Sequence, residues 1–165
     1  MVKEVSDITV QKVWDVLNQI PDPDIPVISI VELGIVRNVA VKDNNVEVII
    51  TPSYSGCPAM HVFKEDIITT LTNIGAKKVE ISITHSLAWT TDWLSNNVKE
   101  KLKNYGIAPP EQNSETEVLF SNKKITCPFC SGTYTKRTSQ FGSTPCKALW
   151  YCNNCQQPFE YFKCY

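Results

Sequence analysis

Two CxxC pairs near the end of the chain constrain its fold more than any other feature. The pairs are Cys127-Pro-Phe-Cys130 and Cys152-Asn-Asn-Cys155, with 21 residues between them. Each pair lets two sulfur atoms converge from one tight turn, and two such turns from neighbouring hairpins complete a tetrahedron suited to zinc or iron. The spacing therefore predicts a structural four-thiolate zinc site, with iron or a redox-active dithiol as the alternatives.

The distribution of the cysteines divides the chain. Cys57 is the one cysteine among residues 1–106, whereas the last 59 residues contain six of the seven. Disulfides would suit a small secreted domain, but we find no apolar signal segment at the start of the sequence and no apolar run of transmembrane length. We therefore expect reduced cysteines, a cytoplasmic location and two parts of different character.

The charge pattern argues against a polyanion as the main partner. The chain has a formal charge of -1, residues 1–106 sum to -3, and residues 123–165 carry +5 before any metal is bound. Neither part has the charge run of a nucleic-acid or membrane-binding tail. Nine aromatic residues within 123–165 could stack on single-stranded nucleic acid, but a small module also fills its core and its protein interfaces with rings. We favour the second interpretation and expect no membrane contact.

The apolar periodicity predicts an α+β fold, with helices packed on a small mixed or antiparallel sheet and a separate metal ribbon after it. Pro109-Pro110 and a mostly polar stretch indicate a linker. The expected domains are an α+β domain at 1–106, a linker at 107–122 and a four-cysteine ribbon at 123–165. The expected elements are a helix at 10–17, extended segments at 29–32, 35–41 and 46–51 with a turn at 43–45, a helix at 58–74, a strand at 78–84, and a helix capped by Thr90 or Thr91 and ending at Gly106.

Cys57 is the second candidate site. Pro58 is typical of the first position of a helix, which places Cys57 at the helix cap. Unpaired amide hydrogens and the helix dipole stabilise a thiolate there, and such a thiolate can act as a nucleophile or as a metal ligand. The same spacing is equally consistent with a small buried cysteine that only packs in the core.

Two histidines are weaker candidates. His61 lies four residues after Cys57 and could share its helical face, which would make a Cys/His pair. A lone histidine on a helix more often makes one hydrogen bond at the surface, and no Asn or Asp partner is identifiable from the sequence. His85, at the end of the expected third strand, is an equally weak candidate.

The remaining candidate functional residues are two aspartates and two further cysteines. Asp22 and Asp24 flank Pro23, an arrangement that could serve acid/base chemistry or a hard cation but is ordinary turn chemistry, which we favour. Cys146 and Cys164 lie in the ribbon outside both CxxC pairs. They could be alternative metal ligands, a redox pair or packing residues, and the spacing does not decide among these.

Several segments carry a resemblance to known families. Residues 22–26 (DPDIP), 29–36 (SIVELGIV) and 51–58 (TPSYSGCP) resemble the small domain of iron-sulfur assembly and targeting factors, including the SufT type. Residues 141–149 (FGSTPCKAL) and 159–164 (FEYFKC) resemble the ending of the PaaD family of phenylacetate-degradation proteins. The combined resemblance covers residues 10–165.

The resemblance implies a non-catalytic accessory protein of the phenylacetyl-CoA ring 1,2-epoxidase system of aerobic phenylacetate catabolism. Such a protein would mature or maintain the metal centre of a partner without binding the aromatic substrate. Its partners would be oxygenase subunits or iron-sulfur assembly proteins, with a homodimer as a further possibility. The resemblance also implies that Cys57 holds iron or an iron-sulfur cluster transiently and that the loop of Asp22 and Asp24 is functional surface, although related domains usually have Glu where this chain has Asp24.

Three other functions remain as alternatives. In the first, the ribbon is an electron-transfer or docking module of the oxygenase that holds redox-active iron. In the second, the ribbon binds nucleic acid. In the third, the protein is a thiol enzyme built on Cys57, for which no triad is identifiable.

Overall fold

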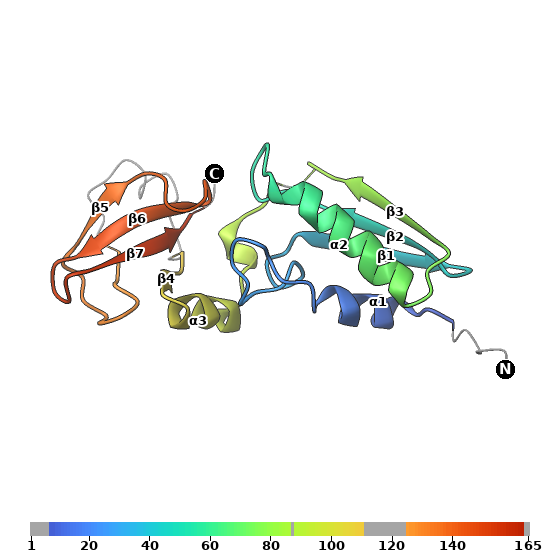
Figure 1. Cartoon of the computed structure of the whole chain (residues 1–165), viewed down its shortest axis with the longest axis horizontal. Helices are drawn as coiled ribbons and strands as arrows, with labels where there is room; N and C mark the ends of the chain where they lie inside the picture. The colour runs from blue at the N-terminus through green and yellow to red at the C-terminus, as the bar shows by residue number, and fades with distance from the viewer. Residues whose placement is uncertain (1–6, 87, 111–124, 164–165) are drawn as a thin grey trace. The chain divides into compact units, whose positions relative to one another are not determined.

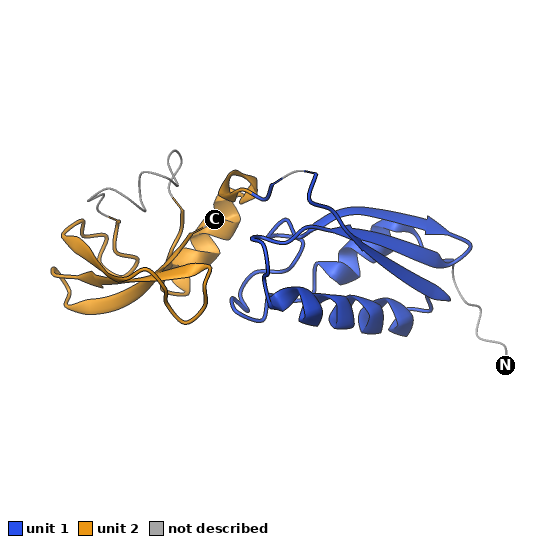
Figure 2. Ribbon diagram, turned by 90° about the horizontal axis from the view of Figure 1, so that it is seen from above, with its two compact units in different colours: residues 1–89 blue, residues 90–165 orange. Residues whose placement is uncertain are grey.

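The computed structural model describes residues 7–86, 88–110 and 125–163. The chain forms two compact units, residues 1–89 and residues 90–165, each described by itself below (Figure 2). In the described ranges no helix combines the length and the hydropathy needed to span a bilayer.

The N-terminal unit is a three-stranded mixed sheet with two helices, which confirms the predicted α+β class. The strands β1 and β2 form an antiparallel hairpin, whereas β2 and β3 are parallel and are joined through α2 as a crossover (Figure 1). The elements are α1 (Val10–Leu17), β1 (Val36–Lys42), β2 (Asn45–Ile50), α2 (Ala59–Asn73) and β3 (Lys78–Ile83).

The hairpin turns at Asp43 and Asn44, which have φ angles of 53° and 63°. Aspartate and asparagine tolerate this left-handed conformation, and two such residues in succession match the twist of the flanking strands. The Asn44 side chain also accepts a hydrogen bond of 2.8 Å from the amide of Ile8. The turn therefore holds the segment before α1 as well as the two strands.

The core of this unit lies on one face of the sheet. Val46, Val48 and Ile50 of β2 are buried, and the exposed Glu47 points to the other face. Across the buried face lies α2 (Figures 1 and 2), and α1 contacts both α2 and β1. The buried residues of α2 recur at helical spacing: Ala59, Phe63, Ile67 and Leu71.

The expected extended segment at 29–32 was wrong, because Ser29 forms only an isolated bridge with Pro21 and residues 30–32 form turns. The Ser29 hydroxyl accepts a hydrogen bond from the Glu32 amide at 3.0 Å, and the Glu32 carboxylate accepts one from the Ser29 amide at 3.1 Å. This reciprocal pair is a capping box, a Ser-x-x-Glu pattern that stabilises a turn over an extended strand.

The C-terminal unit contains a helix and a four-stranded sheet in the order β4-β7-β6-β5 (Figure 1). Its pairs β5/β6 and β6/β7 are antiparallel, and β4/β7 is parallel. The elements are η1 (Thr91–Trp93), α3 (Asn96–Asn104), β4 (Ile107–Ala108), β5 (Thr135–Ser139), β6 (Lys147–Cys152) and β7 (Gln157–Phe162).

Residues 90–110 differ in detail from the structure that the sequence predicts. Thr90 caps only the short η1 turn, and the cap of α3 is Ser95, whose hydroxyl accepts from the Val98 amide at 3.3 Å. Helix α3 belongs to the C-terminal unit, and β4 falls inside the expected linker, while residues 111–122 of that linker lie outside the described residues. The domain boundaries at 106 and 122 stay a prediction.

Candidate metal centre and reactive cysteine

The four CxxC cysteines converge in the C-terminal unit. Their Sγ atoms all lie within 4.8 Å of one another. The Cys127–Cys155 and Cys130–Cys152 sulfur distances are 3.7 and 3.6 Å. A regular tetrahedron with metal–sulfur bonds of about 2.3 Å has sulfur–sulfur distances of about 3.8 Å. The spacing thus fits tetrahedral thiolate coordination of one zinc-sized ion.

The first cysteine turn is fixed by its backbone. The Cys127 carbonyl accepts from the Ser131 amide, and the Cys127 amide donates to the Gly132 carbonyl, both at 2.9 Å. The Gly132 amide lies 3.4 Å from the Cys130 sulfur and can donate to it. A Cβ on Gly132 would meet the Asn154 side chain at 2.9 Å, so this turn and the second cysteine turn approach each other closely. In the folded unit these contacts fix the first cysteine turn against the second one.

The thiols have opposed pKa shifts. Backbone amides, first that of Cys155 and then that of Asn154, lower the pKa of Cys152 to about 7, against the effect of burial. Burial raises the pKa of Cys155 to about 12 and also raises that of Cys127. A divalent cation favours the thiolate form of every ligand, so metal binding to this group releases protons.

The cysteine group rests on a small apolar core. Trp150 contacts Tyr161 edge to face, with ring centroids 6.3 Å apart. Cys130 is exposed and Cys155 is half-buried, so the group meets solvent on one side. The core residues are Ala108, Ile125, Cys127, Ala148, Trp150, Cys152, Phe159 and Tyr161.

Cys57 lies in the loop that joins β2 to α2. Helix α2 begins at Ala59 with Pro58 as its cap, one residue later than expected, and the Cys57 carbonyl accepts from the Met60 amide at 3.3 Å. The thiol side chain is half-buried and forms no disulfide. Gly56 has φ +80°, with open space where a Cβ would stand. Cys57 is thus in the turn that leads into α2, beyond the carboxyl end of β2.

The two histidines are at the surface. His61 Nε2 lies 3.4 Å from Glu65 Oε1, and its side chain is 79% exposed. His85 is exposed and follows β3. Within the described ranges, the four ribbon cysteines are the only group of three or more Cys, His or acidic donors already at metal-binding distances. The suggested Cys57/His61 pair therefore has no preformed third ligand.

Asp22 has the structural environment of a turn residue. It is 5% exposed, and its Oδ1 accepts from the amides of Asp24 and Ile25 at 2.8 and 2.7 Å. These bonds form an Asx turn, which supports the turn interpretation of the Asp-Pro-Asp segment. Asp24 is half-buried. A functional role for this loop stays a prediction.

Cys146 is separate from the four-cysteine group. Its buried Sγ lies 3.0 Å from the Thr144 hydroxyl, and its carbonyl accepts from the Lys163 amide at 2.9 Å. Among the described donors it does not join the metal group. Cys164 lies outside the described residues.

An ion pair that the sequence analysis missed holds the loop between β5 and β6. The Lys147 side chain is 5% exposed, and its Nζ lies 3.1 Å from Glu160 Oε2. Glu160 Oε1 accepts from the Ser143 amide at 2.7 Å. Burial alone would raise the pKa of Glu160, but the bonds from Ser143 and Lys147 outweigh it and lower that pKa. Glu160 is the sole acidic residue of 123–165, a signal that could have identified the pair.

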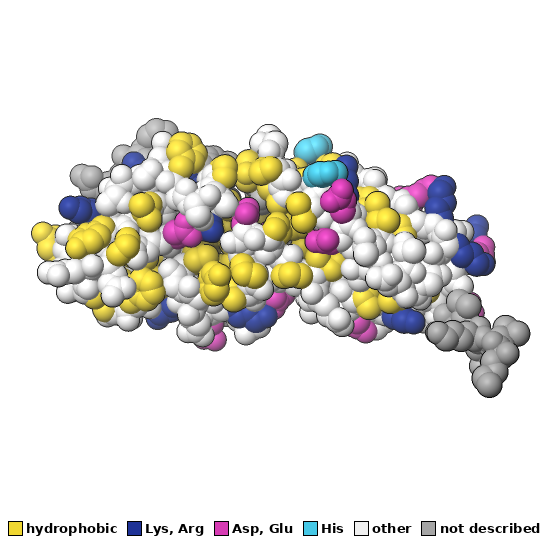
Figure 3. Space-filling model, viewed as in Figure 1, with side chains coloured by type: hydrophobic (Ala, Val, Ile, Leu, Met, Phe, Trp, Pro, Cys, Tyr) yellow, Lys and Arg dark blue, Asp and Glu magenta, His cyan; other side chains and the backbone are white. Residues whose placement is uncertain are grey.

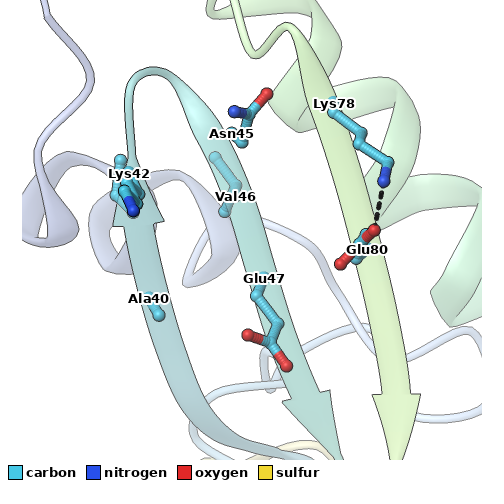
Figure 4. A pocket seen from close by; sticks show the side chains of 8 residues that line it. Ala40, Lys42, Asn45, Val46, Glu47, Lys78 and Glu80 are labelled. Carbon is cyan, nitrogen blue, oxygen red and sulfur yellow. Dashed lines mark hydrogen bonds and ion pairs between the residues drawn. The ribbon is translucent and has the colours of Figure 1, made fainter.

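A depression of about 280 Å³ lies at the hairpin end of the N-terminal sheet (Figure 4). It is lined by both signs of charge, including Glu47 on β2 and an ion pair between Lys78 and Glu80 on β3. These residues lie near the beginning of β2 and β3, whereas Cys57 follows the end of β2. The depression is therefore not part of the Cys57 site.

Comparisons with known proteins match both parts of the chain. A family described as iron-sulfur cluster assembly protein matches residues 10–83, and one described as PaaD zinc beta ribbon domain matches residues 111–163. A protein of Escherichia coli (strain K12) that is named as a subunit of 1,2-phenylacetyl-CoA epoxidase is 43% identical over 155 residues, which are 94% of this chain and 93% of that protein.

Two solved structures share the α+β fold. A DUF59 domain from Bacillus anthracis has a TM-score of 0.52 and 26% identity, covering 56% of this chain and 89% of that one. A conserved hypothetical protein from Thermotoga maritima has a TM-score of 0.51 and 26% identity, covering 58% of this chain and 95% of that one.

Proposed function

This chain belongs to the PaaD family, in which an iron-sulfur cluster assembly domain precedes a zinc β-ribbon, and from that premise we propose that it is an accessory factor of a phenylacetyl-CoA epoxidase. In this proposal it matures or maintains the metal centre of an oxygenase partner and does not itself act on the aromatic substrate. Cys57 carries iron or an iron-sulfur cluster transiently, and the four ribbon cysteines hold zinc permanently.

The contrast between the two cysteine sites carries the proposal. The ribbon offers four sulfurs at tetrahedral spacing, a closed set that leaves no position for exchange. Cys57 offers one half-buried thiol outside any disulfide. A single protein thiolate leaves coordination positions open, so a partner's ligands can bind the cargo before Cys57 releases it.

The transfer step is a ligand exchange without net electron transfer. A thiol of the partner loses its proton as its sulfur binds the metal of the cargo. The bond from the metal to the Cys57 sulfur breaks, and Cys57 takes up a proton. The oxidation state of the cargo is unchanged, so no reductant is needed.

The test replaces Cys57 with Ser in a cell that depends on the epoxidase. We expect an unchanged zinc content and an unchanged fold, but lower iron occupancy and lower activity of the oxygenase partner. Cys146→Ser is the matched control, because Cys146 is also a reduced cysteine outside the metal group. Full partner activity in the Cys57→Ser strain would refute the proposal.

Metal analysis of protein purified without oxygen distinguishes this proposal from the main alternative, an electron-transfer module. About one zinc per chain, with little or labile iron, supports a structural ribbon and a carrier cysteine. Tightly held stoichiometric iron with visible absorbance in the ribbon would instead favour an electron-transfer module, since four thiolates at this spacing also suit iron.

A further inference from the structure

Three potential metal donors lie at one end of the N-terminal sheet, where the strands β2 and β3 end. Strands β2 and β3 are parallel, and α2 connects them, so the carboxyl ends of both strands and the beginning of α2 lie at the same end of the sheet. Cys57 and His61 stand at the beginning of α2, and His85 follows β3. Figure 3 displays the chain's two histidine side chains gathered at one place on the surface.

His61 has two features that suit a metal ligand beside the beginning of α2. The Cα–Cβ bonds of an α-helix tilt toward its N-terminus, which is the end of α2 where Cys57 lies. The Glu65 carboxylate one turn later lies 3.4 Å from His61 Nε2. A carboxylate on one ring nitrogen leaves the other nitrogen as a lone-pair donor, which is the usual arrangement for a metal-binding histidine.

The backbone around His85 is fixed at the end of β3. The Thr84 amide donates to the Ile50 carbonyl at 2.9 Å, which continues the pairing with β2 up to the residue before His85. The Thr84 hydroxyl lies 2.8 Å from the Ser86 hydroxyl and accepts from the Ser86 amide at 3.3 Å. His85 therefore lies between two residues joined by hydrogen bonds, at the same end of the sheet as the loop that contains Cys57.

We propose that Cys57, His61 and His85 form a three-donor site for a divalent first-row transition metal ion. The site rests on the proposed carrier function, because it names the donors that hold the cargo beside Cys57. One thiolate and two imidazoles suit Fe²⁺, Co²⁺ and Zn²⁺, and three protein ligands leave a fourth position open for a partner's ligand. The site would then carry a single ion, and Glu65 would position His61 without touching the metal.

The three donors converge by side-chain rotation when the ion binds. Of the donor groups in the described residues, only the ribbon cysteines already lie within 4.8 Å of one another. His61 and His85 are exposed and Cys57 is half-buried, so their side chains can turn without unpacking the core. The uncharged ring nitrogens and the single thiolate also avoid the repulsion that four thiolates create.

The experiment titrates Co²⁺ into the full-length chain with zinc already in the ribbon, without oxygen. The readout is the thiolate-to-cobalt charge-transfer absorbance, which reports a bond to a cysteine sulfur. We expect one additional equivalent to bind, with the absorbance lost in Cys57→Ser. His61→Ala and His85→Ala should each weaken binding by at least about 100-fold, since removal of a supporting residue alone costs 10–100-fold.

A matched pair of carboxylate variants tests the positioning role of Glu65. Glu65→Gln should weaken Co²⁺ binding about 10-fold. Asp66→Asn, which removes the neighbouring exposed carboxylate of α2, should leave it unchanged. Equal effects of the two variants would show that net charge, and not the contact with His61, controls the affinity.

The outcomes for this site and for the carrier function are separable. Absence of a cobalt equivalent beyond the zinc of the ribbon, or unchanged affinity in either histidine variant, overturns the three-donor site. If Cys57→Ser still lowers partner activity in that case, the carrier function stands with Cys57 alone. Full partner activity in Cys57→Ser refutes the carrier function whatever the histidine variants show.

Discussion

In the buried ion pair of Lys147 and Glu160, loss of the Glu160 carboxylate should destabilise the fold more than loss of the Lys147 ammonium. Glu160→Gln leaves the Lys147 ammonium, 5% exposed, without its carboxylate. Breaking a buried pair by removal of one partner costs 3–5 kcal/mol, and we take about 3 kcal/mol because the Glu160 side chain is 24% exposed. Lys147→Met removes the buried charge itself and leaves a carboxylate that keeps the Ser143 amide and water, so it should cost about 1 kcal/mol.

Hydrogen exchange of peptides from β6 and β7 measures this difference within the C-terminal unit alone. A loss of about 3 kcal/mol corresponds to roughly 150-fold faster exchange of the most protected amides. Both variants and the wild type must be zinc-saturated, because metal binding is coupled to folding. The reasoning would be refuted if Lys147→Met accelerated exchange as much as Glu160→Gln does. It would also be refuted if exchange in Glu160→Gln were less than about threefold faster than in the wild type.

The same pair predicts a pH dependence with a definite sign. The folded-state pKa of Glu160 is lowered below its ordinary value of 4.5. Its contribution is therefore complete above that value and is lost as the pH falls through the lowered pKa. The stability advantage of the wild type over Glu160→Gln should shrink on acidification below pH 4.5, and an advantage that grows there would contradict this assignment.

Three further predictions concern the metal, a loop and a cap. Cys152→Ser or a strong chelator should remove the ribbon metal and unfold the β5–β7 sheet while α1 and α2 stay folded, as measured by metal content and hydrogen exchange; an intact sheet without metal would contradict it. Gly142→Ala places a Cβ 2.7 Å from Glu160 Oε1 and should destabilise the C-terminal unit by about 1–2 kcal/mol in urea unfolding, and a neutral effect would be inconsistent with the clash. Ser95→Ala removes the hydroxyl that caps α3 and should cost about 1 kcal/mol, whereas Ser95→Asp should retain most of the stability; equal losses would exclude capping.

Much of the fold follows from local patterns in the sequence. The hairpin depends on Asp43 and Asn44, and α2 on the spacing of Phe63, Ile67 and Leu71, all of which are properties of a few consecutive residues. The convergence of the four ribbon cysteines was also predictable, because metal-ligand spacing reflects one local turn geometry used twice.

The features that were missed depend on contacts or on competing local signals. Apolar residues made 29–32 look extended, but the Ser29 and Glu32 capping box determines the backbone there. The prediction placed the cap of the last helix at Thr90 or Thr91, but Thr90 caps only η1, and Ser95 caps α3. In the sequence Lys147 is only one of the basic residues of 123–165, because its burial depends on pairing with Glu160, which lies on a different strand.

The pairing of β4 with β7 has a consequence for how the ribbon can be isolated. Ile107 and Ala108 pair with Glu160 and Tyr161, so the strand beside β7 comes from a segment before the cysteines. A fragment that begins at residue 123 would leave that side of β7 as an open edge, with amide and carbonyl groups available to another copy. A fragment that begins at Thr90 retains β4 and α3, so self-association should distinguish the two fragments, with the shorter one forming the larger species.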